Sequence, residues 1–102
     1  MAEDLTYTAA RVLHAIRSGQ LYGFQIMAAA ELPSGTVYPV LRRLEKARFI
    51  RSQWEKAAIA RAEQRPVRKY YQVTDEGEAA LAEAEKRYRF PEAAAEPKEA
   101  QR

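Results

Sequence analysis

The chain contains no cysteine and only one histidine, His14, among its 102 residues. Without cysteine, neither a disulfide nor a metal site with thiolate ligands can form. The sequence also lacks a glycine-rich phosphate loop and a pair of carboxylates in an apolar setting, two common elements of active sites. We therefore predict that the protein is not an enzyme and that it holds no metal and no cofactor.

Long apolar runs are also absent, and no stretch approaches the roughly 20 residues that a membrane-spanning helix requires. The acidic start of the chain has neither the basic nor the apolar region of a signal peptide. A chain without cysteine agrees with a reducing compartment. We expect a cytoplasmic protein with no membrane partner.

The length is suited to one small domain. Hydrophobic residues make up 47% of the chain, but many of them are alanine, which predicts a thin and helix-rich core. Helices with spare apolar surface often complete their burial against a second copy of the same chain. A homodimer is therefore expected.

Basic residues are concentrated in the middle of the chain. Residues 34–71 contain ten cations and three acids and carry a net charge of +7, whereas the whole chain carries +3 and the remainder therefore −4. A basic middle within an acidic frame predicts a polyanionic partner, and nucleic acid is the most common one.

Residues 34–46 have the pattern of an amphipathic helix with a basic face. The apolar stripe follows the helical repeat at Val37, Val40, Leu41 and Leu44. The opposite face begins with small residues and ends in cations, with Gly35, Pro39, Arg42 and Lys46. We expect Ser34 to cap this helix and Pro39 to lie near enough to its N-terminal end for the missing N–H to cost little. Such a face suits a phosphate-lined groove, but a solvated basic surface has the same pattern.

Two more helices are predicted before this one. The first is expected over residues 5–18, with Leu5, Ala9, Val12, Leu13 and Ile16 as its apolar stripe and Gly19 as its C-terminal cap. The second is expected over residues 23–31 and is ended by Pro33. The second and third predicted helices, joined by a tight turn, make a helix-turn-helix.

Two strands are predicted next, over residues 50–55 and 67–73, because polar and apolar side chains alternate there. We expect Trp54 to pack between this hairpin and the core. The connecting residues 56–66 are long for a hairpin loop and predict a mobile basic tip that gains a helical turn on meeting a partner.

A last helix is predicted to begin after a Thr74 cap and to run to Tyr88 or Phe90, where Pro91 ends it. The order of elements then predicts a mainly α fold with a small two-stranded β-wing, which is a winged helix-turn-helix. The domain is expected over residues 1–90, including a dimerisation helix at about 74–90, and residues 91–102 are expected to be a disordered tail.

Five segments of the sequence occur in an order that is typical of one family. They are Tyr22-Gly23, Gly35-Thr36-Val37-Tyr38-Pro39-Val40-Leu41-Arg42-Arg43-Leu44-Glu45, Trp54-Glu55, Arg68-Lys69-Tyr70-Tyr71 and Thr74-Asp75-Glu76-Gly77. Together they resemble the PadR family of bacterial transcriptional regulators over about residues 5–85. The resemblance implies a homodimer whose winged helix binds double-stranded DNA.

Two features depart from the family pattern. Family members usually carry a longer C-terminal helix that builds the dimer, whereas Pro91 should limit the last helix here to about four turns. We expect dimerisation through the first and last helices. The tip at residues 56–66 also lacks the usual glycine-rich turn.

The resemblance implies DNA contacts on the third helix and on the wing. The expected residues are Ser34, Thr36, Tyr38, Arg42, Arg43 and Lys46 on the helix, and Arg61, Arg65, Arg68 and Lys69 on the wing. Arg42 can read a guanine or neutralise a phosphate, and Tyr38 can serve in packing instead. Each wing cation is nearly as typical of a solvated surface.

Some short relatives bind flat aromatic compounds at the dimer centre, and Tyr7, His14 and Tyr88 would line such an effector site here. The resulting hypothesis is a sequence-specific repressor that acts as a homodimer on a pseudo-palindromic operator and is released by a small aromatic effector. The alternative is a winged-helix module for protein–protein interaction without specific DNA binding. The pairing of a basic helix with a basic wing favours DNA.

Overall fold

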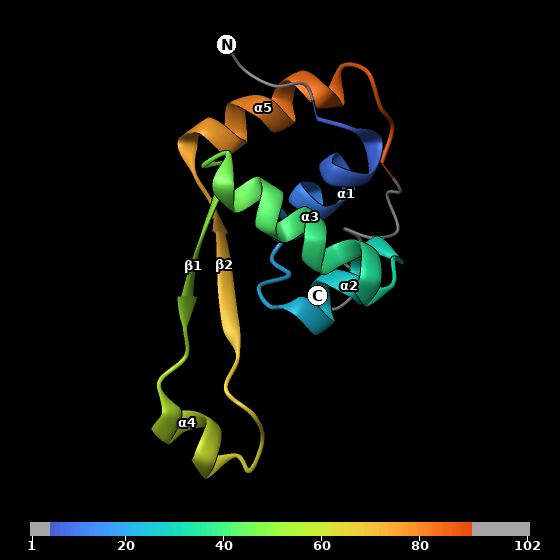
Figure 1. Ribbon diagram of the computed structural model, residues 1–102. Helices are drawn as coiled ribbons and strands as arrows, with labels where there is room; N and C mark the ends of the chain where they lie inside the picture. Colours follow the sequence, from blue (N-terminus) through green and yellow to red (C-terminus); the bar gives the residue numbers. More distant parts are fainter. Residues whose placement is uncertain (1–4, 91–102) are drawn as a thin grey trace, which may run out of the picture.

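The computed structural model describes residues 5–90, which form five helices and one two-stranded antiparallel sheet (Figure 1). The elements are α1 (Tyr7–Arg17), α2 (Gly23–Ala30), α3 (Ser34–Lys46), β1 (Ile50–Trp54), α4 (Ala57–Ala62), β2 (Lys69–Val73) and α5 (Asp75–Glu85). The predicted winged helix-turn-helix is confirmed. The predicted tail at residues 91–102 lies outside the described residues.

The core lies between α1, α2, α3 and α5, where the predicted apolar stripes meet. The five residues of the first predicted stripe are all buried, although α1 begins only at Tyr7 and Leu5 therefore precedes it. All four stripe residues of α3 are buried as well. Fully burying one valine, leucine or isoleucine contributes roughly 1.5–3 kcal/mol. Because burial fixes one face of α3 against the core, the opposite face with its cations must point away from it.

The start of α3 differs from the prediction. Pro33 takes the capping position, Ser34 is the first helical residue, and no side chain makes a capping hydrogen bond. The Pro33 carbonyl instead accepts from the amides of Thr36 and Val37. Pro39 stands inside the helix in its second turn, where its missing N–H leaves the Gly35 carbonyl without the usual helical partner.

The last helix is shorter than predicted, because α5 ends at Glu85 and not at Tyr88 or Phe90. The amides of Arg87 and Tyr88 both donate to the Ala84 carbonyl at 2.9 Å, which turns the chain. The Tyr88 hydroxyl then donates to the Leu5 carbonyl at 3.3 Å. The chain after α5 therefore folds back onto the start of α1 instead of extending the helix.

The hairpin is anchored to the helical body at its base and at its side. Its register pairs Ile50 with Val73 and Trp54 with Lys69. The connector between α1 and α2 adds a short edge, because the Tyr71 amide donates to the Leu21 carbonyl at 2.8 Å and Tyr22 forms a bridge with Tyr70. The wing consequently has a fixed direction relative to α3.

Gly77 allows α5 to begin directly against the base of the hairpin. A Cβ atom at Gly77 would collide with the backbone carbonyl oxygen of Phe49 and with a methyl group of Val73. Thr74 joins the same two segments, since its hydroxyl donates to the Arg48 carbonyl at 2.7 Å and accepts from the Gly77 amide at 3.0 Å. The Thr-x-x-Gly motif is therefore a packing motif.

The wing tip is not the mobile loop that the sequence predicted. The hairpin extends away from the helical body as an arm, and α4 forms its end (Figure 1). Ala60 of α4 is buried, with 1% of its surface exposed. The tip is thus a folded element without any partner present.

A partly buried ion pair, which we call the Glu55/Arg65 clasp, closes the base of this tip. The guanidinium of Arg65 donates to both carboxylate oxygens of Glu55 at 2.8 and 2.7 Å, and the Arg68 amide adds a third hydrogen bond at 3.1 Å. The Glu55 side chain is 4% exposed and that of Arg65 is 17% exposed. The hydrogen bond from Arg65 lowers the pKa of Glu55 to about 2, against burial, which raises it. Bidentate charged pairs of this kind are strong and fix geometry.

Replacing Gly77 with alanine should destabilise the protein, because the colliding atoms belong to the backbone and cannot rotate away. We expect Gly77→Ala to lower the free energy of unfolding by about 1–3 kcal/mol in urea titrations followed by circular dichroism. Gly35→Ala is the matched control, since no atom lies within 4 Å of a Cβ there. That variant should be unchanged or up to about 1 kcal/mol more stable. A Gly77→Ala protein as stable as the wild type would contradict the packing described.

The Glu55/Arg65 clasp should persist to low pH. Because the pKa of Glu55 is about 2 in the folded protein and 4.5 ordinarily, its contribution to stability is present above pH 4.5 and is lost as the pH falls towards 2. The carboxyl carbon of Glu55 should therefore titrate near pH 2 by nuclear magnetic resonance. A midpoint near 4.5 would refute the clasp.

The same clasp should protect the amides of α4 from hydrogen exchange. We expect faster exchange in α4 in Glu55→Gln, because the neutral amide leaves Arg65 without its charged partner. Glu63→Gln is the control, since Glu63 also contacts Arg65 but its side chain is 59% exposed and such pairs contribute little.

Candidate nucleic-acid interface

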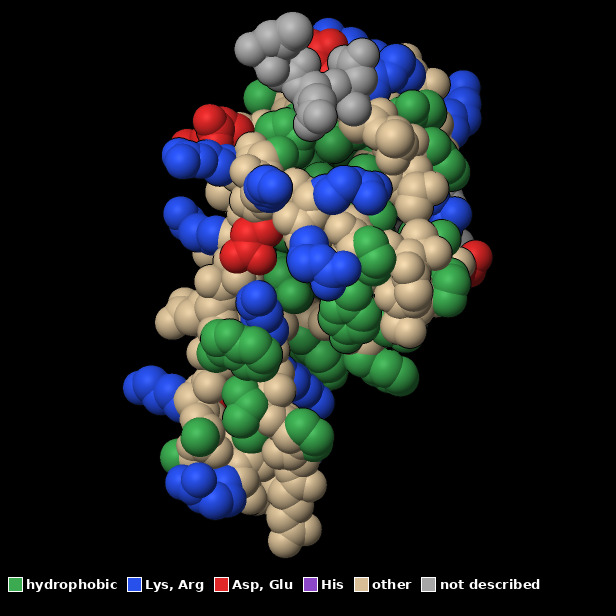
Figure 2. Space-filling model, viewed as in Figure 1, with side chains coloured by type: hydrophobic (Ala, Val, Ile, Leu, Met, Phe, Trp, Pro, Cys, Tyr) green, Lys and Arg blue, Asp and Glu red, His purple; other side chains and the backbone are tan. Residues whose placement is uncertain are grey.

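The exposed face of α3 carries the cations that the sequence assigned to it. Lys and Arg side chains gather over α3 and continue down the hairpin on the same side of the molecule (Figure 2). Arg42, Arg43 and Lys46 are exposed, and within residues 5–90 none of them forms an ion pair with an acid. Their charge is therefore fully available to a polyanion.

The N-terminal end of the same helix presents small polar groups. Ser34 is exposed and Thr36 is partly exposed. The hydroxyl of Ser34 makes no capping hydrogen bond. Because both residues stand in the first turn of α3, their side chains lie close to the positive end of the helix dipole. This combination suits phosphate oxygens.

Tyr38 combines the two roles that the sequence left open. Its ring lies against Gly23 at the start of α2, where a Cβ atom would collide with the Tyr38 hydroxyl and ring. The remainder of the side chain is accessible, with 43% of its surface exposed. Gly23 of the Tyr-Gly motif therefore leaves room for the Tyr38 ring, which packs there at the edge of the exposed face of α3.

Two wing cations are held by aromatic rings. The Arg68 guanidinium lies 4.0 Å from the centre of the Tyr22 ring. The Lys69 ammonium lies 5.5 Å from the Trp54 ring and 4.0 Å from a carboxylate oxygen of Glu45 on α3. Such contacts orient a cation while leaving its donors partly available.

The other two predicted wing contacts have different surroundings. Arg61 is exposed on α4. Arg65 is instead occupied by the Glu55/Arg65 clasp, because its guanidinium donates to Glu55, to Glu63 and to the Pro66 carbonyl. The geometry therefore makes Arg65 a residue that holds the wing tip together, whereas Arg61 is accessible there.

The helix and the wing enclose a groove of about 920 Å³, which we call the α3–wing groove. Among the residues that line it are Tyr38 and Arg42 from the helix and Trp54, Arg68 and Lys69 from the wing. Tyr71 forms part of its floor, and burial raises the pKa of the Tyr71 hydroxyl, with a smaller contribution from Glu45. Predicted residues from distant parts of the sequence, such as Arg42 and Arg68, thus face one space.

Two apolar residues of this groove were not predicted as site residues. Trp54 is 62% exposed and Phe24 is 71% exposed, so the prediction that Trp54 packs between wing and core is wrong. Trp54 shares a face with the buried Ile50, but it lies at the far end of β1, where the arm extends past the core. Strand alternation indicates which face a residue occupies and not how far the core extends beneath it.

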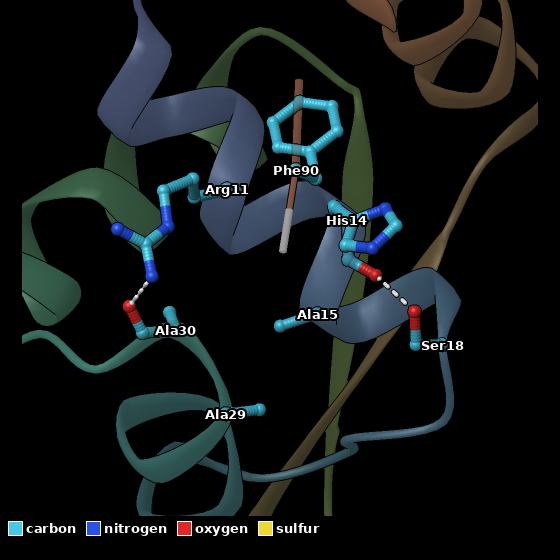
Figure 3. Close-up of a pocket in the computed structure, with 7 residues that line it drawn as sticks. All are labelled: Arg11, His14, Ala15, Ser18, Ala29, Ala30 and Phe90. Carbon is cyan, nitrogen blue, oxygen red and sulfur yellow. Dashed lines mark hydrogen bonds between the residues drawn. The ribbon is translucent and has the colours of Figure 1, made fainter. Parts of the chain in front are cut away.

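The residues predicted for an effector site do come together on α1. The Tyr7 and Tyr88 rings meet edge to face at 5.2 Å, and Phe90 stacks on His14 at 4.8 Å and on Tyr7 at 6.1 Å. Beside His14 and Phe90 lies a pocket between α1 and α2, where Arg11 donates to the Ala30 carbonyl (Figure 3). Its volume of about 10 Å³ leaves room for roughly one water molecule.

Two further properties concern the described part of the chain. No group of acidic and histidine side chains between residues 5 and 90 is arranged to hold a metal ion. None of the helices in that range has the length and apolar character needed to cross a membrane.

Comparisons with known proteins agree with this geometry. The family model described as the transcriptional regulator PadR-like family matches residues 12–83. An X-ray structure of a PadR-like transcription factor from Bacteroides fragilis is 29% identical, with a TM-score of 0.63 over 76% of each chain. The crystal structure of smu.1704 from Streptococcus mutans UA159 is 28% identical, with a TM-score of 0.63, and the match covers 85% of this chain and 82% of that one. No curated protein matches the sequence.

The matched region includes α2, α3, the wing and most of α5, which are the elements that build the surface described above. Members of the matched family are DNA-binding regulators of transcription and not enzymes. Since the family model covers well over half of the sequence, this chain belongs to the PadR-like family of transcriptional regulators.

Proposed function

We propose that the protein is a sequence-specific repressor that binds a pseudo-palindromic operator as a homodimer. The observation that supports this most strongly is the set of accessible cations on α3, of which Arg42 lines the same groove as Arg68 and Lys69 of the wing. A winged helix uses such a pair of surfaces when α3 enters the major groove and the wing follows the adjacent backbone or minor groove.

Each residue of the surface has a proposed role. Ser34 and Thr36 bind phosphate oxygens at the start of α3, and Arg43 and Lys46 add charge near its end. Tyr38 contacts the DNA with the part of its side chain that Gly23 leaves exposed. Arg42 either reads a guanine or neutralises a phosphate.

The wing contributes Arg68 and Lys69, which the rings of Tyr22 and Trp54 hold in place before any DNA binds. Arg61 reaches the backbone from α4. Arg65 holds the tip through the Glu55/Arg65 clasp and is not proposed as a direct contact. A pre-formed wing lowers the ordering cost that a flexible tip would have on binding.

Dimerisation is proposed through α1 and α5, the two elements farthest from the wing tip (Figure 1). Tyr7 at the start of α1 is 40% exposed, which leaves apolar surface for a second copy. A two-fold axis would place the two α3 helices about 34 Å apart, one turn of DNA. A regulator of this kind works in the cytoplasm, where bacterial DNA lies.

Release by a small aromatic effector is the remaining part of the proposal. Tyr7, His14 and Tyr88 form an aromatic cluster with Phe90. Because the pocket beside Phe90 is small, a flat ligand would have to take the place of the Phe90 ring against His14. Displacement of Phe90 would then shift the chain at the end of α5 and disturb the proposed dimer contact.

Binding to the DNA upstream of the protein's own gene should depend steeply on salt. Fluorescence anisotropy should give a line of log affinity against log salt with a slope of about −0.9 for each phosphate contact. Arg42→Ala should weaken operator binding by roughly 1–3 kcal/mol if Arg42 reads a base, with a smaller effect on unrelated DNA. If Arg42 holds a phosphate instead, the magnitude of this slope should fall by about 1 for every DNA sequence.

Arg17→Ala is the matched control, because Arg17 is an exposed cation on α1 that pairs with Glu78 at 2.9 Å. Because α1 is also a proposed dimer element, the oligomeric state of this variant is measured first by sedimentation. At the same dimer content as the wild type, it should leave both the affinity and the slope unchanged. Absent or salt-independent binding would reject the DNA proposal and favour the alternative of a protein–protein interaction module.

A further inference from the structure

The α3–wing groove exposes more apolar surface than a solvated wing requires. Phe24, Tyr38, Trp54 and Val67 all line it, and each has at least 40% of its surface exposed. We call these four side chains the apolar strip. Large apolar groups that share one concave surface usually mark a place where something binds.

We propose that the apolar strip is a second component of the DNA interface, in which Trp54 packs on the deoxyribose groups of one strand. This inference rests on the proposed function. It assigns a binding role to Trp54, which neither the charge pattern nor the recognition helix suggests.

The charges of the groove select a nucleic-acid strand as the occupant. Arg42, Arg65, Arg68 and Lys69 line the groove, and Glu45 is the acid among its lining residues. Arg65 is paired with Glu55, which does not line the groove. An uncharged protein segment would bury these cations without compensation, whereas the phosphates of a strand would neutralise them. A sugar–phosphate strand alternates anionic and less polar groups, and the groove likewise places cations beside apolar side chains.

The position of the groove explains why the sugars, and not the bases, are the expected contact. If α3 lies in the major groove and the wing tip at the neighbouring minor groove, the strand that separates these two grooves must cross the space between them. That strand presents phosphates and deoxyribose, since its bases are stacked within the duplex. Trp54 projects into this space from the end of β1, next to Lys69, its cross-strand neighbour.

A contact with sugars has two consequences that separate it from the cation contacts. It carries no sequence information, so its loss should weaken the binding of every duplex by the same factor. It also releases no counterions, so its loss should leave the salt dependence unchanged. Loss of Arg42 should behave differently in either of its possible roles. If Arg42 reads a base, its loss weakens operator binding more than the binding of other DNA. If Arg42 binds a phosphate, its loss changes the salt dependence.

The intrinsic fluorescence of the protein reports on this site directly, because Trp54 is the only tryptophan of the chain. Titration of the full-length protein with a duplex from its own upstream DNA should change the Trp54 emission and protect it from acrylamide quenching. The change should saturate at the stoichiometry that anisotropy gives with the same labelled duplex. An unrelated duplex at low salt should produce the same change.

Trp54→Ala should weaken the binding of operator and unrelated DNA alike by about tenfold, the effect of roughly 55 Å² of lost apolar contact. The slope against salt should stay that of the wild type. Trp54→Phe should retain most of the affinity. Leu21→Ala is the matched control, since Leu21 is 42% exposed but does not line the groove.

The outcomes distinguish this inference from the function on which it rests. DNA binding by anisotropy without any change in Trp54 emission or quenching would overturn the inference and leave the proposed repressor intact. A loss confined to the operator, or a changed salt slope in Trp54→Ala, would also overturn the sugar contact. Emission that changes with protein concentration in the absence of DNA would show that a second copy covers the strip, which overturns it as well. No binding of any duplex would reject both proposals.

Discussion

Burial of the apolar stripe of α3 is the constraint on which the rest of the surface depends. Val37, Val40, Leu41 and Leu44 lie in the core, and the rotation of the helix about its own axis is therefore fixed. The face that remains outside carries Arg42, Arg43 and Lys46. A recognition helix needs such a fixed rotation, because a turn of one residue, about 100°, would move its cations out of reach.

The second requirement is a wing with a fixed direction, and packing of the backbone supplies it. Gly77 allows α5 to press against the Phe49 carbonyl, and the Leu21 carbonyl accepts from the Tyr71 amide on the side of the arm. At the far end, the Glu55/Arg65 clasp folds the tip into α4. Hydrogen bonds and an ion pair hold the arm where no hydrophobic core reaches, so the cations on it are in place before a partner arrives.

Most of the fold could be predicted from the sequence, because each helix has a strong apolar period and the strands alternate. The stripes of α1 and α3 and the strand pairing depend on local pattern, and they were predicted correctly. The helix α4 was missed because the ion pair that closes the base of the tip joins Glu55 and Arg65, which are ten positions apart and meet only after the hairpin has closed. The early end of α5 was missed because Tyr88 and Phe90 pack on α1, a contact that no local pattern encodes.

In the candidate site, too, features set by local pattern could be predicted and features set by distant contacts could not. The cations of α3 were correctly expected on an exposed face, because helical periodicity alone places them there. Nothing local distinguishes Arg65 from Arg61, although one is held by Glu55 and the other is accessible. Trp54 was expected to pack between the hairpin and the core, whereas the length of the arm leaves it exposed in the α3–wing groove.

The central claim is that α3 and the wing of each subunit in a dimer bind DNA as one continuous surface. Hydroxyl-radical footprinting of the DNA upstream of the gene tests it most directly. We expect two protected half-sites with centres about 10 base pairs apart, each with protected sugars on the strand beside the wing. A single unpaired footprint, protection without the wing-side sugars, or no protection at all would contradict the account.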